Sequence, residues 1–179
     1  MDTISHGLYS VFLVKGIFKK GKLWLAFLFG ILPDIIPFGI PFIQMIISGI
    51  SFSKDNPSQL ILSYTHFLYN FTHSIVIAFV IFGLIYLFKK RIYVWMLGWP
   101  LHILVDIPTH SNAFFPTPLL YPISNFTING IGWGNPYIFF PNWILIAVLF
   151  FIVFNKEIKM FFKKLRDYNL KLNKFTSKI

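Results

Sequence analysis

Residues 98–110 read GWPLHILVDIPTH and place two histidines and an aspartate in an otherwise apolar stretch. His102 and Asp106 are four residues apart, so on a helix they lie on the same face. An imidazole and a carboxylate on adjacent turns can bind one cation or can hydrogen-bond each other inside a bundle, and this pair alone favours neither. Pro108 is expected to end the helix just after Asp106, which would let His110 fold back over the pair.

The rest of the chain has the composition of an integral membrane protein. Hydrophobic residues make up 56% of it, charged residues only 12%, and the mean hydropathy is +0.68. A soluble domain carries roughly 25% charged residues. The absence of cysteine excludes thiolate metal sites. The formal net charge is +10, but the basic residues flank apolar runs, so we expect membrane lipids and not nucleic acid as their partners.

Five apolar runs predict an all-α, multi-pass membrane bundle of four to five transmembrane helices, because about twenty helical residues cross a bilayer core. The run 3–18 is short and either spans the membrane or lies on its surface. The run 24–50 contains Pro33, Pro37 and Pro41, and we expect two shorter helices or a re-entrant element there. The five runs cover residues 3–18, 24–50, 65–88, 92–108 and 137–154.

The distribution of charge predicts the orientation in the cell membrane. Basic residues fill the connections after the first and third runs and the tail, whereas the other two connections are nearly neutral. By the positive-inside rule the basic segments are cytoplasmic, which puts the N-terminus outside and the C-terminus inside. The basic residues are Lys15, Lys19, Lys20, Lys22, Lys89, Lys90, Arg91 and eight residues of the tail.

Residues 156–179 are expected to form a basic amphipathic cytoplasmic tail, separate from the membrane-embedded residues 1–155. Apolar side chains recur at helical spacing with lysines on the opposite face, which is typical of a helix on the inner leaflet near anionic headgroups. A solvated helix is the alternative interpretation. The apolar positions are Ile158, Phe161, Phe162 and Leu165.

The connection 108–136 is long, uncharged, and rich in proline, glycine, asparagine and aromatic residues. Long ordered loops are usually functional. We therefore expect an extracytoplasmic lid packed over the outer ends of the helices. An aromatic belt at the membrane interface is the alternative.

Further ionisable residues lie in the other apolar runs at a depth similar to that of His102 and Asp106. They are His6, Asp34 and His73, and Asp34 lies about ten residues, or ~15 Å, from the inner edge. Ionisable groups within a membrane are costly unless paired, and they favour a functional hypothesis. His and Asp ligands together suit Zn²⁺ or Mn²⁺. By contrast, Asp2 is expected to be a helix N-cap, and His66 to pack near the interface.

These residues fall in motifs whose order and spacing resemble the YdjM-like family of membrane-bound, metal-dependent hydrolases, over about two thirds of the chain. The resemblance implies a helical hydrolase domain over residues 1–155. It implies metal-ligand roles for His6, Asp34, His73, His102 and Asp106, with His110 as a further candidate. The His-x-x-x-Asp element is also similar to part of the metal site of zinc-dependent phospholipase C, which suggests phosphoester substrates. The motifs are SHGLYS (5–10), LPD (32–34), FTHS (71–74), GWPLHILVDIPTH (98–110) and PLLYP (118–122).

The sequence departs from the family pattern at two motifs. Ile36 replaces the second acid of LPDID, and Leu68 and Tyr69 replace the histidine and arginine that precede the threonine and histidine of FTHS. Arginine is a natural bidentate partner of phosphate. Its absence leaves the substrate open, and the missing acid leaves the number of metal ions at one or two.

The sequence thus predicts a metal-dependent hydrolase, in which metal-activated water attacks a membrane-associated ester or phosphoester. Asp106 and His110 are the expected catalytic residues, and Zn²⁺ or Mn²⁺ the expected cofactor. The chain has neither a GxSxG motif nor a cysteine nucleophile. A membrane transporter or metal-ion carrier with a His/Asp site is the alternative, followed by a structural protein in which His–Asp contacts only hold the bundle together.

Overall fold

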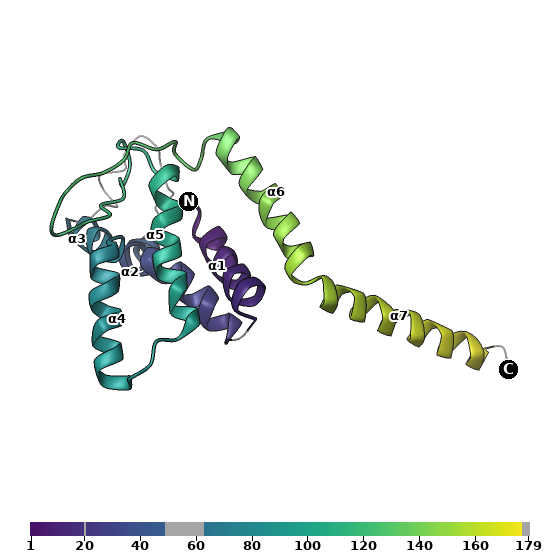
Figure 1. Ribbon diagram of the computed structural model, residues 1–179. Helices are drawn as coiled ribbons and strands as arrows, with labels where there is room; N and C mark the ends of the chain where they lie inside the picture. The colour runs from purple at the N-terminus through teal and green to yellow at the C-terminus, as the bar shows by residue number, and fades with distance from the viewer. Residues whose placement is uncertain (20, 49–62, 177–179) are drawn as a thin grey trace.

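The computed structural model describes residues 1–19, 21–48 and 63–176, and within these ranges the chain forms helices and loops without β-strands (Figure 1). The predicted all-α class is confirmed. The neutral connection between the second and third runs falls mostly in 49–62, outside the described residues. The elements are α1 (Thr3–Phe12), the π-helix η1 (Leu13–Phe18), α2 (Leu23–Ser48), α3 (Ser63–Thr72), α4 (Ile75–Lys89), the 3₁₀-helix η3 (Val94–Leu97), α5 (Gly98–Thr109), α6 (Pro136–Val153) and α7 (Asn155–Thr176).

Among the described residues, two helices are long and apolar enough to cross a membrane, namely α2 over Leu23–Ile43 and α6 over Pro136–Val153. The bent pair of α3 and α4 gives a third crossing if it acts as one span. The prediction of four to five spans is therefore not confirmed. The fourth run falls short because α5 has only 12 residues, or ~18 Å, against a hydrocarbon core of ~30 Å.

The second apolar run is one continuous helix, and the expected division at its prolines is wrong. Pro33 and Pro37 both lie inside α2. Pro37 has no N–H to donate to the carbonyl of Pro33, four residues earlier. The hydroxyl of Thr72, at the end of α3, donates to that carbonyl over 2.9 Å. The freed acceptor is thus satisfied by a neighbouring helix, and the turn is maintained.

The third run, in contrast, is broken where a single helix was expected. The axes of α3 and α4 differ by 68°, and His73 and Ser74 occupy the break. Ser74 is the N-cap of α4, because its side chain accepts a hydrogen bond from the backbone N–H of Ile77. The break places His73 at the junction of two helices.

Glycines allow α1, α2 and α5 to pack closely. A Cβ atom on Gly30 of α2 would lie 2.3 Å from the hydroxyl oxygen of Ser10 and 2.6 Å from the carbonyl oxygen of His6. A Cβ on Gly98, at the start of α5, would lie 3.0 Å from the Gly30 backbone nitrogen. Small residues are a common means of close helix approach in membranes. Here they bring His6 and His102 side by side.

The helix α5 continues through Pro108 to Thr109, so the expected end just after Asp106 is wrong by one turn. Proline removes one hydrogen bond, which is tolerated in the last turn. The following loop folds back on this end, since Gly130 N donates to the His110 carbonyl and Ile131 N to the Pro108 carbonyl. Part of the predicted lid therefore contacts the end of α5.

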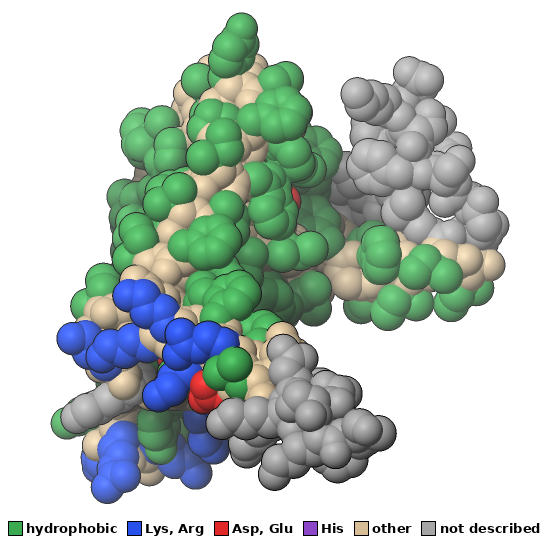
Figure 2. Space-filling view, turned by 90° about the vertical axis from the view of Figure 1, so that its right-hand side faces the viewer, with side chains coloured by type: hydrophobic (Ala, Val, Ile, Leu, Met, Phe, Trp, Pro, Cys, Tyr) green, Lys and Arg blue, Asp and Glu red, His purple; other side chains and the backbone are tan. Residues whose placement is uncertain are grey.

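The long helices α6 and α7 lie on the side of α1, and α7 extends away from the other helices (Figure 1). Tyr9 and Ser5 of α1 each hydrogen-bond the buried Asn142 of α6 over 2.8 Å. Near the start of α7, Glu157 pairs with Lys15. Figure 2 shows Lys and Arg side chains gathered at one end of a largely hydrophobic face, as expected if the basic segments share one side of the membrane.

We propose that α7 lies on an anionic membrane surface. Its side chains Phe161, Phe162 and Tyr168 are exposed, and lysines occupy the other face. Because the chain has no cysteine, a fluorophore can be placed on a single cysteine at Leu165 or, as the control, at Lys163, which is roughly 200° away around the helix. In vesicles containing phosphatidylglycerol, spin-labelled acyl chains should quench the probe at 165 much more than the probe at 163. Equal quenching at both positions would contradict the proposal.

Candidate metal centre

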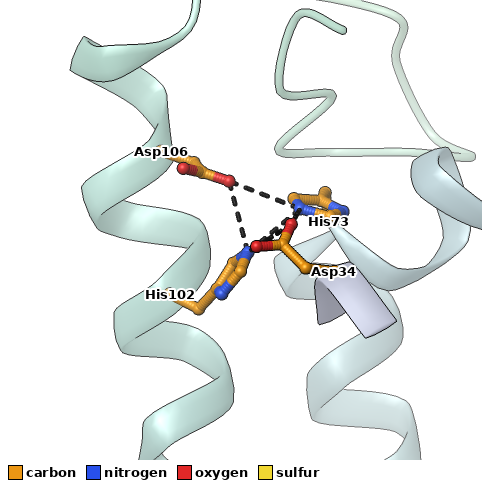
Figure 3. A group of neighbouring side chains, drawn as sticks. All are labelled: Asp34, His73, His102 and Asp106. Carbon is orange, nitrogen blue, oxygen red and sulfur yellow. Dashed lines mark hydrogen bonds and ion pairs between the residues drawn. The ribbon is translucent and has the colours of Figure 1, made fainter. Parts of the chain in front are cut away.

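Four predicted ligands meet at one point inside the bundle (Figure 3). Asp34 comes from the middle of α2, His73 from the α3–α4 break, and His102 and Asp106 from adjacent turns of α5. One ligand atom from each lies within 4.8 Å of the others, and all four residues are buried. Side chains far apart in sequence thus form a compact group of imidazole nitrogens and carboxylate oxygens.

The distances within this group suit ligands that share one ion. The Nε2 atoms of His73 and His102 are 3.0 Å apart. Asp106 Oδ2 lies 3.3 Å and 3.2 Å from these two nitrogens, and Asp34 Oδ1 lies 3.4 Å and 3.6 Å from them. Tetrahedral zinc sites use the same kinds of donor atom.

Backbone carbonyls orient both histidines toward the centre. His102 Nδ1 lies 2.7 Å from the Gly30 carbonyl, and His73 Nδ1 lies 3.1 Å from the Tyr69 carbonyl. A carbonyl only accepts, so each Nδ1 carries the proton and each neutral ring keeps its lone pair on Nε2. Two lone pairs at 3.0 Å repel unless a proton or a metal ion lies between them. This is the usual arrangement of metal-binding histidines, whose other nitrogen is held by a carbonyl or carboxylate.

The charge of the centre also calls for a cation. Asp34 and Asp106 are both buried, and in the described part of the chain neither forms an ion pair with Lys or Arg. The amino group of Met1 contacts Asp106, and one positive charge is too little to balance two buried carboxylates. The donor set, the orientation of the rings and the charge therefore all fit a divalent metal ion.

The other two predicted ligands, His6 and His110, adjoin the group on the second oxygen of Asp106. His6 Nε2 lies 2.9 Å from Asp106 Oδ1, and its ring stacks on His102 with centroids 3.7 Å apart. His110 Nε2 lies 3.3 Å from the same oxygen. The amino nitrogen of Met1 also contacts it. All six predicted site residues thus come together, although only four form the compact group.

Two further neighbours of the centre were not predicted from the sequence. The hydroxyl of Thr3 donates to Asp34 Oδ2 over 2.7 Å. The ring of Tyr69 stacks on His73 with centroids 3.7 Å apart, and its hydroxyl donates to the Phe115 carbonyl. The only sequence signal for Thr3 was its position. It lies about one helical turn before His6 of the SHGLYS motif.

The sequence analysis assigned Asp2 and His66 to roles outside the site, and both residues lie outside it. Asp2 is the N-cap of α1, where it accepts from the backbone N–H of Ser5. His66 is exposed and stacks on Phe115. Ser74 satisfies backbone groups at the start of α4 and in the loop after α5.

Replacing Thr3 with valine should weaken metal binding without unfolding the protein. The change keeps the shape of the side chain but removes the hydrogen bond that orients Asp34, and losses of such supporting groups typically reduce metal affinity ~10–100-fold. Competition with a chelator measures the affinity. Thr109→Val is the matched control, because that hydroxyl bonds only to the Val105 carbonyl of its own helix. Equal affinity in both variants would contradict the role of Thr3.

The fold and the buried cluster define a helical membrane protein with a His–Asp centre that can hold a metal ion. Comparison with family models identifies the family: the YdjM inner membrane protein model matches residues 1–166. The chain belongs to this family. Comparisons with curated proteins and with solved structures found no match.

Proposed function

We propose that this protein is a membrane-bound metal-dependent hydrolase with its centre at Asp34, His73, His102 and Asp106. The observation that carries the proposal is the convergence of these four buried ligand atoms within 4.8 Å. Zn²⁺ is the metal that best suits two imidazoles and two carboxylates, with Mn²⁺ as the alternative. A divalent ion in such a centre lowers the pKa of a bound water to near neutrality and thereby supplies a nucleophile.

The residues around the centre have separate roles in this proposal. His73 and His102 would present Nε2 to the ion, because the Tyr69 and Gly30 carbonyls hold their Nδ1 protons. Asp106 would hold the ion through its carboxylate and would orient the water bound to it. His110 lies at the loop side of Asp106, with Nδ1 2.8 Å from the Phe115 carbonyl. Its Nε2 lies 3.3 Å from Asp106 Oδ1, where His110, or a second ion bound to it, would stabilise charge that develops on the leaving group.

The surroundings favour a membrane-associated ester or phosphoester as the substrate. The centre lies between helices whose outer surfaces are covered by large apolar side chains (Figure 2). The basic connections lie at the opposite end of α5 from Asp106, so we place the centre in the outer half of the membrane with the N-terminus outside. A substrate that reaches it from the lipid phase need not leave the bilayer.

A carrier for metal ions would need polar groups along a path across the membrane. In the described residues, every buried His and Asp side chain belongs to this single centre. The described residues contain no second group of buried His or Asp side chains between the centre and the end of the molecule where Lys and Arg gather. This one-sided arrangement supports catalysis over transport.

Metal removal and replacement test the proposal. The purified protein, reconstituted in vesicles, should hydrolyse phospholipid or a generic phosphoester, lose this activity with a chelator, and regain it with Zn²⁺ or Mn²⁺. The same vesicles, loaded with a metal-sensitive dye, report ion flux. Ion flux without hydrolysis of any ester or phosphoester would reject the hydrolase and favour the carrier.

A further inference from the structure

The carboxylate of Asp106 has two oxygens that face two different pairs of histidines. Oδ2 lies between His73 and His102, as the dashed lines of Figure 3 show, and the other oxygen points away from them. Oδ1 instead lies 2.9 Å from His6 Nε2 and 3.3 Å from His110 Nε2. The second pair lies outside the compact four-residue group.

The two imidazole contacts on Oδ1 are not aligned hydrogen bonds, whereas the amino group of Met1 does donate to this oxygen. His6 Nδ1 and Nε2 and His110 Nε2 are buried and have no aligned hydrogen-bond partner. Their residues are only 1% and 7% exposed, so water does not compensate. Buried imidazole nitrogens normally have a partner. An ion bound to Oδ1 would give both Nε2 atoms a partner.

The protonation of His110 strengthens this interpretation. Its Nδ1 lies 2.8 Å from the Phe115 carbonyl, which can only accept, so Nδ1 carries the proton. The neutral ring then has a lone pair on Nε2, 3.3 Å from a carboxylate oxygen that carries lone pairs of its own. A positive charge between them converts this repulsive contact into an attractive one.

We propose that Asp106 bridges two divalent-ion positions. The first is the centre described above, which uses Oδ2. The second uses Oδ1, His6 Nε2 and His110 Nε2, and the amino nitrogen of Met1 contacts the same oxygen. The inference rests on the proposed function, since both positions share the Asp106 carboxylate.

A second ion also specifies the substrate class. The positive charge of two divalent ions exceeds the negative charge of the carboxylates Asp34 and Asp106, so the centre acquires a net positive charge. Such a centre binds an anionic phosphoester better than a neutral ester, because paired ions stabilise both the attacking and leaving oxygens of a phosphoryl group. This compensates for Tyr69, which stands where an arginine is expected in related sequences.

Metal content tests the second position independently of activity. The full-length protein in detergent, equilibrated with Zn²⁺ and desalted, should contain two ions per chain by elemental analysis. His110→Ala should lose one ion and keep the other. His66→Ala is the matched control, because that exposed histidine lies outside the centre, and it should keep both.

Loading the unaltered protein with Mn²⁺ provides a test that needs no variant. Bridged ions in two-metal sites lie ~3.5–4 Å apart, so electron paramagnetic resonance should show a spin-coupled pair. One ion per chain with an uncoupled spectrum would reject the second position, and accompanying hydrolysis would leave the proposed function standing. Two coupled ions without hydrolysis of any phosphoester would support the bridge and reject the hydrolase.

Discussion

Replacing Asp106 with asparagine should abolish both metal binding and turnover. The amide keeps the shape of the side chain but removes the negative charge, and its nitrogen cannot act as a ligand. Asp106 contacts four imidazole nitrogens within 3.3 Å, more than any other residue of the centre. In the proposed arrangement of two ions, no other substitution of one residue removes a ligand from both of them.

Elemental analysis and a phosphoester assay measure this effect, and size-exclusion chromatography in detergent checks folding. Asp167→Asn is the matched control, since it removes a carboxylate from the exposed part of α7. The control should retain full metal content and activity. A folded Asp106→Asn protein that still holds its metal would show that this carboxylate is not a ligand.

Gly30→Ala should have the second largest effect, although Gly30 is not itself a ligand. The added methyl group would lie 2.6 Å from the His6 carbonyl, a backbone atom that cannot rotate away. Overpacking of this kind costs about 1–3 kcal/mol. If α1 and α2 move apart to relieve this clash, His6 and the Gly30 carbonyl that orients His102 move as well. We expect a lower unfolding temperature together with weaker metal binding.

Gly83→Ala is the matched control, because a Cβ atom there meets nothing within 4 Å. Alanine favours helix over glycine by up to about 1 kcal/mol, so this variant should be as stable as the parent or more so. Thermal unfolding in detergent and chelator competition compare the two variants. If Gly30→Ala were as stable as Gly83→Ala, the close packing of α1 on α2 would be wrong.

The site could be predicted from sequence better than the path of the helices. Ionisable residues in an apolar chain are rare and costly, so His102 and Asp106 stood out, and the four-residue spacing already placed them on one face. His73 and Asp34 were predicted to lie at similar depth, and they do meet. In each case the presence of an ionisable side chain within an apolar run was sufficient evidence for a site residue.

The course of the backbone was harder to predict because it depends on partners distant in sequence. Pro37 was expected to break α2, but Thr72 supplies the donor that the freed Pro33 carbonyl needs. The ten residues around His73 (69–78) contain no proline or glycine, yet the helix ends there because Ser74 caps a new one. The roles of the Gly30 and Tyr69 carbonyls could not be foreseen, since backbone groups leave no trace in sequence.

The position of the ligands along the chain determines when the centre can exist. Asp34 lies in the second helix, His73 follows the third, and His102 and Asp106 arrive only with α5. During synthesis the first carboxylate therefore enters the bilayer long before its imidazole partners have left the ribosome. A metal ion that uses all four ligands can therefore bind only after α5 has been made, when the earlier helices are already inserted.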